Sequence, residues 1–204
     1  MTSALKHYHH GDLKAAILER AAEIIEEKGI EALSLRAIAR DLNVSHGAPN
    51  RHYKTRADLL NALATDGWER IRLATLDAAD QEASDHPFDK LNAMGRGFLL
   101  WALRNKAAFI SITHPDVGRH ADFALTEAMT SFQDAVRTVV AETQLSGRYP
   151  TVDTTLLTLY TNSVPFGLAT LLLNPLMMTD VSSWDEEEMV AKLIDLVVPR
   201  RVPV

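Results

Sequence analysis

Apolar residues recur at intervals of three and four along almost the whole length of this 204-residue chain. This spacing places apolar side chains on one face of an α-helix, whereas a half-buried β-strand requires strict alternation. The chain contains no alternating segment and no internal repeat. The sequence therefore predicts an all-α protein of about nine helices.

The N-terminal part predicts three helices of unequal length. The first covers about 12–28 and ends at Gly29, which suits a helix C-cap. Ser34 is placed to cap a second helix of about two turns. After a three-residue turn, Ser45 can cap a third short helix over 46–52, where a proline in the first turn is tolerated.

The remaining chain predicts longer helices. One begins at Arg56 and ends near Ala83, and the next three are marked by apolar residues over 91–102, 109–113 and 125–140.

Two further helices are predicted near the C-terminus. The block 151–173 is apolar nearly all round, so we expect it to be buried on several sides and bent at Pro165. Ser183 and Glu186 have the spacing of a capping box before a last helix, 184–198. Because these two helices carry more apolar surface than one protomer's body can cover, they predict a homodimer interface.

A long helix followed by two short ones across a tight turn is helix-turn-helix spacing. A recognition helix needs a narrow N-terminal end and outward hydrogen-bonding side chains. An isolated short surface helix with solvated residues would look similar. The residues that fit the recognition helix are His46, Gly47, Ala48, Asn50, Arg51 and His52.

The charge of the chain is unevenly distributed. With 21 Lys and Arg against 27 Asp and Glu, the net charge is −6, which by itself argues against a nucleic-acid partner. The segment from Ser34 to Arg56 nevertheless carries +4, and residues 1–60 carry +1, which leaves −7 for 61–204. This distribution favours phosphate binding by one defined face on a body that DNA repels.

Four runs in the first 60 residues have the order and spacing of a known family. They are Tyr8-His9-His10-Gly11-Asp12-Leu13, Ala32-Leu33-Ser34-Leu35-Arg36-Ala37-Ile38-Ala39, Val44-Ser45-His46-Gly47-Ala48-Pro49-Asn50-Arg51-His52-Tyr53 and Arg56-Ala57-Asp58-Leu59-Leu60. With these runs the chain resembles TetR-family transcriptional regulators. The resemblance implies a helix-turn-helix DNA-binding domain over 1–55 and a larger helical effector-binding and dimerisation domain over 56–204.

The resemblance also implies roles for single residues. Ser34 and Arg36 would meet phosphates, Tyr53 would pack under the recognition helix, and Arg56 would hold a phosphate at the start of the long helix. Asn50 departs from the tyrosine common in the family, but an amide can bind adenine or phosphate. The predicted DNA-binding residues are Ser34, Arg36, Ser45, His46, Gly47, Ala48, Asn50, Arg51, His52, Tyr53, Lys54 and Arg56.

An effector pocket is expected among the helices of the second domain, lined by aromatic and methionine side chains with a few polar groups. The alternative is that these residues only form the core. The candidates are Trp68, Met94, Phe98, Trp101, His114, Met129, Phe132, Tyr160, Asn162 and Phe166.

The segment Phe166–Leu171 resembles one TetR branch that carries Trp and His before the glycine. The matching positions here are Asn162 and Phe166, which implies a different ligand. The alternative is that Gly167 only permits close helix packing.

No other chemistry is indicated. The chain has no cysteine, and the cluster of His7, His9, His10 and Asp12 is assigned no metal site. Because catalytic and phosphate-loop motifs are absent, we predict no cofactor and no enzymatic activity. An all-α enzyme or carrier with an incidental basic segment is the alternative.

Together these features predict a cytoplasmic, homodimeric regulator that binds a palindromic double-stranded DNA operator. It would act as a repressor released by a small molecule. No membrane association is expected, because the longest apolar stretch, 149–179, is broken by Asp153, threonines and prolines.

Overall fold

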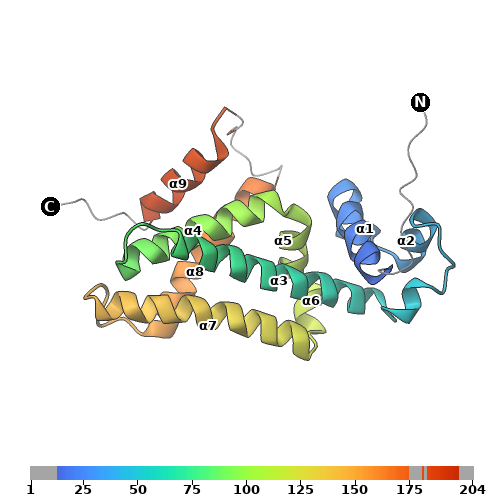
Figure 1. Cartoon of the computed structure of the whole chain (residues 1–204), viewed down its shortest axis with the longest axis horizontal. Helices are drawn as coiled ribbons and strands as arrows, with labels where there is room; N and C mark the ends of the chain where they lie inside the picture. Colours follow the sequence, from blue (N-terminus) through green and yellow to red (C-terminus); the bar gives the residue numbers. More distant parts are fainter. Residues whose placement is uncertain (1–12, 175–180, 182, 198–204) are drawn as a thin grey trace.

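The structure is a computed structural model that describes residues 13–174, 181 and 183–197. Within these residues it is all-α, with nine α-helices, two short 3₁₀ helices and no strand. Figure 1 shows an elongated molecule with α1 and α2 at one end, from which α3 runs into a larger helical body. The predicted fold class is confirmed.

The small N-terminal bundle contains α1 (Leu13–Lys28), η1 (Ile30–Ala32), α2 (Leu35–Asp41) and η2 (Pro49–Arg51). Gly29 ends α1 with φ at 81°, a conformation that glycine adopts without strain. The apolar stripe that predicted α1 is buried, together with part of α2. The buried residues are Ala16, Ile17, Ala21, Ile24 and Ile25 on α1, with Ile38 and Ala39 on α2.

The prediction of a third α-helix over 46–52 is wrong in its details. Residues 46–48 form a turn, and only Pro49–Arg51 are helical, in the 3₁₀ form. The physical reason is that Pro49 has no N–H, so it cannot donate to the carbonyl of Ser45. That carbonyl instead accepts from Ala48 N–H at 2.9 Å, a tighter 3₁₀-type bond.

The long predicted helix is α3 (Arg56–Asp80), and it packs against α4 (Pro87–Arg104) along much of its length. Thr55 and Asp58 form a capping box at the start of α3. The two helices approach closely at Gly97, where an added Cβ would lie 2.6 Å from the Cβ of Ala78.

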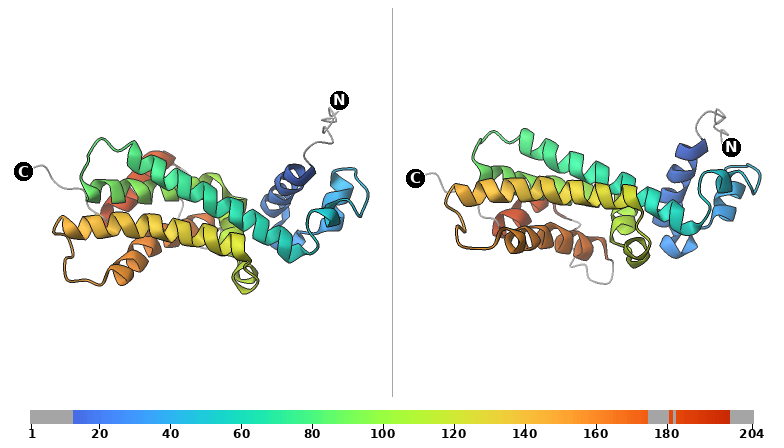
Figure 2. Two further views of the ribbon diagram at one scale, coloured as in Figure 1. Left: turned by 60° about the horizontal axis from the view of Figure 1, so that its bottom comes forward. Right: turned by 90° about the horizontal axis from the view of Figure 1, so that it is seen from below.

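After α4 the chain forms α5 (Lys106–Thr113), α6 (Pro115–Arg119) and α7 (Phe123–Leu145). His114 separates α5 from α6 and caps α6 with its ring. Helix α7 lies beside α3 and α4, and α5 contacts α1 (Figure 2).

The helix predicted over 151–173 is α8 (Thr154–Leu173), but the expected burial on several sides is wrong for the single protomer. Leu156, Leu159 and Tyr160 are exposed, and so is Leu171. Only 22% of the most apolar 18-residue window is buried. By length and composition alone α8 could span a membrane, a test that helices in soluble proteins also pass.

The last helix is α9 (Glu186–Val197), which packs on α4. The predicted capping box at Ser183 is wrong, because the side chain of Asp185 accepts the Glu188 N–H at 2.9 Å instead. Asn92 on α4 donates to Asp195 on α9 at 2.9 Å, which ties these helices together.

Candidate nucleic-acid interface

The turn that ends α2 determines where the following segment points. Asn43 adopts φ 53°, a left-handed conformation that asparagine tolerates better than most residues. Val44 N–H then bonds the carbonyl of Ala39 at 3.0 Å, and Asn43 N–H bonds that of Arg40 at 3.1 Å. This is the hydrogen-bond pattern of a Schellman motif, which stops the helix and redirects the chain.

Most of the predicted DNA-binding residues lie on the surface. Ser34, Ala48 and Arg56 are partly buried, and Tyr53 is only 4% exposed and belongs to the hydrophobic core. No side-chain hydrogen bond caps η2. Ser34 is the N-cap residue of α2 but likewise makes no side-chain cap bond. The exposed members are Arg36, Ser45, His46, Gly47, Asn50, Arg51, His52 and Lys54.

The cations of the segment from Ser34 to Arg56 differ in their ion-pair partners. Arg40 pairs with Asp41 at 3.2 Å. Within the part of the chain that the structure describes, no ion pair involves Arg36, Arg51 or Lys54. These three exposed cations can therefore meet phosphate without first breaking an internal ion pair.

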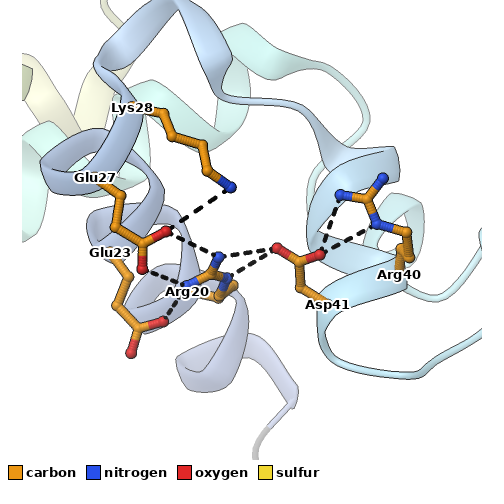
Figure 3. Close-up of polar contacts among 6 residues, drawn as sticks. All are labelled: Arg20, Glu23, Glu27, Lys28, Arg40 and Asp41. Atoms are coloured by element: carbon orange, nitrogen blue, oxygen red, sulfur yellow. Dashed lines mark hydrogen bonds and ion pairs between the residues drawn. The ribbon is translucent and has the colours of Figure 1, made fainter.

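Arg20 forms the centre of a charged network that sequence reasoning missed (Figure 3). Its guanidinium donates to Asp41 from both Nε and Nη2 at 3.0 Å, to Glu23 at 2.6 Å and to Glu27 at 3.2 Å. The spacing of Arg20, Glu23 and Glu27 along one helix was a usable signal. The bond to Asp41 joins α1 to α2 and had no local signal.

This network also sets the titration of Asp41. Burial would raise the pKa of its carboxyl, but hydrogen bonds from Arg20 and Arg40 outweigh burial and hold that pKa below its ordinary value of 3.8. The carboxylates raise the pKa of Arg20 in turn, chiefly through Glu23 and Glu27. The cluster therefore stays charged and fixes α2 against α1.

Arg56 has protein partners rather than an open surface. Its Nη2 donates to the carbonyl of Ile30 at 2.8 Å and lies 3.5 Å from Glu31, while Nη1 lies 3.8 Å from Asp116. His114 Nε2 lies 3.5 Å from the same Glu31. Arg56 thus joins η1 to α6, a role the sequence did not indicate.

The structure brings some predicted effector residues together. Trp68, Phe98, Phe132 and Phe166 meet in one ring cluster with Phe109, which the prediction omitted. Met129 packs against the same core.

A hollow of about 20 Å³ lies beside the ring cluster, lined by Met94, Phe98, Phe132 and Asn162 among others. Tyr160 lines a second small hollow and is largely exposed. Trp101 is buried but lines neither hollow. His114 is placed apart from these residues, at the contact with Glu31.

Residues 17–63 match the model of bacterial regulatory proteins of the tetR family. The N-terminal part of this chain is a tetR-family domain. The match begins inside α1 and runs through η2 into the second turn of α3, so it includes the whole exposed basic segment.

The curated relatives that the chain matches are named HTH-type transcriptional regulators. HTH-type transcriptional regulator Rv1816 of Mycobacterium tuberculosis is 29% identical over 135 residues, which cover 63% of this chain and 58% of the relative. A regulator of Mycobacterium bovis, Mb1846, matches to the same extent. The chain thus spans about 58% of the length of the curated relatives it matches.

Solved structures share the fold over almost the entire chain. A Rhodococcus sp. RHA1 protein of unknown function is 29% identical, with a TM-score of 0.76 over 95% of this chain and 97% of its own. AibR, solved with isovaleryl coenzyme A and operator DNA, has 19% identity and a TM-score of 0.70 over 91% and 97%. At 19% identity, the similarity to AibR shows a shared fold and nothing further.

Proposed function

We propose that this protein is a sequence-specific DNA-binding regulator of transcription. The observation that carries the proposal is the exposed segment of a tetR-family domain in which Arg36, Arg51 and Lys54 make no ion pair with a described residue. The names of the curated relatives support it. In this proposal 46–52 enters the major groove and Ser34 and Arg36 meet phosphates.

A mobility-shift assay with the DNA upstream of the protein's own gene tests this function. At about 0.15 M salt, where weak electrostatic binding is screened, the regulator is expected to retain a discrete shifted complex. Unrelated DNA of the same length is the control. Equal, weak binding to both DNAs that vanishes at this salt would instead favour an all-α enzyme or carrier.

The exposed face of α8 supports a homodimer. Leu156, Tyr160, Ser163, Gly167 and Leu171 are exposed at intervals of three and four residues, which places them along one stripe. A Cβ added at Gly167 would meet no atom within 4 Å, so this glycine does not serve close packing within the described part of one protomer. A second copy of α8 crossing at Gly167 would cover the stripe. Helix α9, with Leu196 exposed, would extend this interface.

Sedimentation of two arginine variants tests the dimer. Thr170→Arg places a charge on the exposed side of α8, whereas Thr138→Arg places one on the exposed side of α7. The controls are matched, because each hydroxyl bonds the carbonyl four residues earlier at 2.8 and 2.9 Å. We expect a dimer for Thr138→Arg and a monomer for Thr170→Arg. A dimer in both would contradict the α8 interface.

The regulator is proposed to be a repressor that a small molecule releases from a palindromic operator. AibR, crystallised in complex with isovaleryl coenzyme A and operator DNA, supports the idea that this fold can bind both a small molecule and DNA. Release requires that the effector bind the free and DNA-bound states with different affinity. Footprinting should show two symmetric half-sites about 34–36 Å apart or slightly more; a single unsymmetrical site would contradict the palindrome.

The proposal divides the chain into 1–55, which binds DNA, and 56–204, which binds effector and partner, and it places the protein in the cytoplasm. Helix α3 packs mainly on α4, α5 and α7 of the larger body and only slightly on α1, which supports a boundary at its start. Limited proteolysis near residue 55 and cell fractionation test the two statements. Cleavage confined to other sites, or recovery in the membrane fraction, would contradict them.

A further inference from the structure

Five aromatic rings form a layer at the centre of the larger body, each from a different helix. Trp68 comes from α3, Phe98 from α4, Phe109 from α5, Phe132 from α7 and Phe166 from α8. Their centroids are 4.6–6.4 Å apart in the contacting pairs. Phe166 contacts three of the other rings, and it alone among the five is only partly buried.

Trp68 carries an unsatisfied donor in this layer. Its side chain is 6% exposed, and Nε1 is buried without a hydrogen-bond partner among the described residues. Buried N–H groups are normally paired, because leaving one without an acceptor costs free energy. The indole N–H of Trp68 thus lacks an oxygen acceptor, although the Trp68 ring packs against Phe132 and Phe166.

Phe166 is the ring best placed to move. It follows Pro165, which has no N–H to donate to the carbonyl of Thr161, so the hydrogen-bond ladder of α8 is interrupted there. It precedes Gly167, where an added Cβ would meet no atom of the described part of the same protomer within 4 Å. The small hollow lined by Phe98, Phe132 and Pro165 adjoins the ring layer. A molecule that replaced the Phe166 ring would therefore lie among Trp68, Phe98 and Phe109.

The residues that line the hollow beside the ring layer are all uncharged. The buried polar residues of the described chain are all neutral, and none is a cation that could pair with a carboxylate. Burying an unpaired charge is far more costly than burying a neutral polar group. These buried polar residues are Asn61, Thr75, Asn92, Ser111, Thr143 and Thr158.

From these observations we infer that the effector of this regulator is an uncharged, largely apolar molecule with one hydrogen-bond-accepting oxygen. It takes the place of the Phe166 ring, and its oxygen accepts the Trp68 indole N–H. The inference rests on the proposed function, because it identifies the effector class of that regulator.

Three probes of similar size test the inference. Acetophenone is neutral and has a carbonyl acceptor, ethylbenzene lacks the acceptor, and benzoate is charged. Each is titrated into the full-length protein labelled with ¹⁵N at its three tryptophans, and the indole N–H signals are followed by NMR. The Trp68 signal is assigned from the Trp68→Phe variant.

Acetophenone is expected to shift the Trp68 signal, ethylbenzene to bind without the shift of a new hydrogen bond, and benzoate not to bind. Trp68→Phe should weaken acetophenone binding by roughly 3- to 10-fold more than it weakens ethylbenzene binding, which is the effect of one lost hydrogen bond. The matched control is Trp184→Phe, which removes an indole that is half exposed and should change neither affinity. Binding to ethylbenzene also shows whether Trp68→Phe still folds with an intact ring layer.

Several results would overturn the inference. These are an unmoved Trp68 signal with all three probes, a benzoate response equal to that of acetophenone, or equal acetophenone affinity in wild type and Trp68→Phe. The mobility shift is measured on the same preparations. A retained DNA complex with failed probe binding rejects only the effector class, whereas loss of the specific DNA complex in wild type rejects the proposed function.

Discussion

Arg51 and Arg56 carry the same charge but have different surroundings. Arg51 is exposed in η2 and makes no ion pair with a described residue, whereas Arg56 is held by the Ile30 carbonyl, Glu31 and Asp116. We expect Arg51→Ala to weaken operator binding and to reduce the slope of log affinity against log salt by about one. We expect Arg56→Ala to lower the melting temperature and to change the slope by much less.

Binding measured at four or more salt concentrations, with melting followed by circular dichroism, separates these effects. Lys106→Ala removes an exposed cation at the start of α5 and should alter neither quantity. An unchanged slope for Arg51→Ala would contradict the placement of η2 at the DNA. A full loss of one slope unit in Arg56→Ala, with normal stability, would restore its expected role as a phosphate ligand.

Asp41 links folding stability to pH. Because its pKa in the folded protein lies below 3.8, the folded state binds fewer protons than the unfolded state in the window just below that value. The stabilisation is fully present above pH 3.8 and is lost as the pH falls through the lower folded pKa. Asp41→Asn should therefore lower the unfolding free energy at pH 7 by roughly 1–3 kcal/mol. Denaturant titrations should show this deficit shrinking on acidification; a deficit that does not depend on pH would contradict the network.

Helix α4 contains two glycines whose replacement by alanine is expected to have opposite effects. A Cβ at Gly97 would lie 2.6 Å from the Cβ of Ala78 and 2.8 Å from the carbonyl oxygen of Ala74, so Gly97→Ala must push α3 and α4 apart. We expect a loss of roughly 1–3 kcal/mol in unfolding free energy. At Gly95 the nearest atom is a side-chain carbon of Ile194 at 3.4 Å.

Gly95→Ala is the matched control on the same helix. Alanine is favoured over glycine within a helix by about 1 kcal/mol, so this variant should be neutral or more stable. Chemical denaturation of both variants measures the difference. Equal stability of the two would show that α3 and α4 do not approach as closely as the structure describes.

The elements that could be predicted from sequence are those whose apolar face is covered by the same protomer. Helices α1, α3 and α7 meet this condition, and their periodicity predicted them correctly. The spacing of apolar residues could not reveal that η2 is a 3₁₀ turn. That form depends on one backbone hydrogen bond that Pro49 cannot donate, because proline has no N–H. The apolar character of α8 was visible, but composition cannot distinguish a buried face from one left for a partner.

For the site, exposed charges were predictable and long-range partners were not. Arg36, Arg51 and Lys54 are exposed as expected, since Lys and Arg side chains are almost never fully buried unless they are paired. The pairs Arg20 with Asp41 and Arg56 with Asp116 join residues that are 21 and 60 positions apart, so no local pattern indicates them. Their geometry depends on how α2 and α6 pack.

At the scale of the whole molecule, each protomer presents one basic segment at one end, and α8 lies in the larger body (Figure 1). A dimer formed through α8 would carry two such segments on an otherwise acidic body. Once one segment is bound, the second meets its half-site at a high effective concentration, which increases affinity by 10²- to 10⁴-fold without a new contact. The acidic body disfavours any other mode of contact with DNA.

Thr170→Arg tests this coupling on the operator. The variant monomer should bind a single half-site with roughly 10²-fold or greater loss of affinity, and its salt slope should fall to about half, because half as many phosphates are neutralised in each complex. Thr138→Arg should bind like wild type, since its added charge lies on α7. Fluorescence anisotropy with a labelled operator measures both quantities. If monomeric Thr170→Arg kept the affinity and slope of wild type, one tetR-family domain would suffice for recognition, and the dimer would serve only stability.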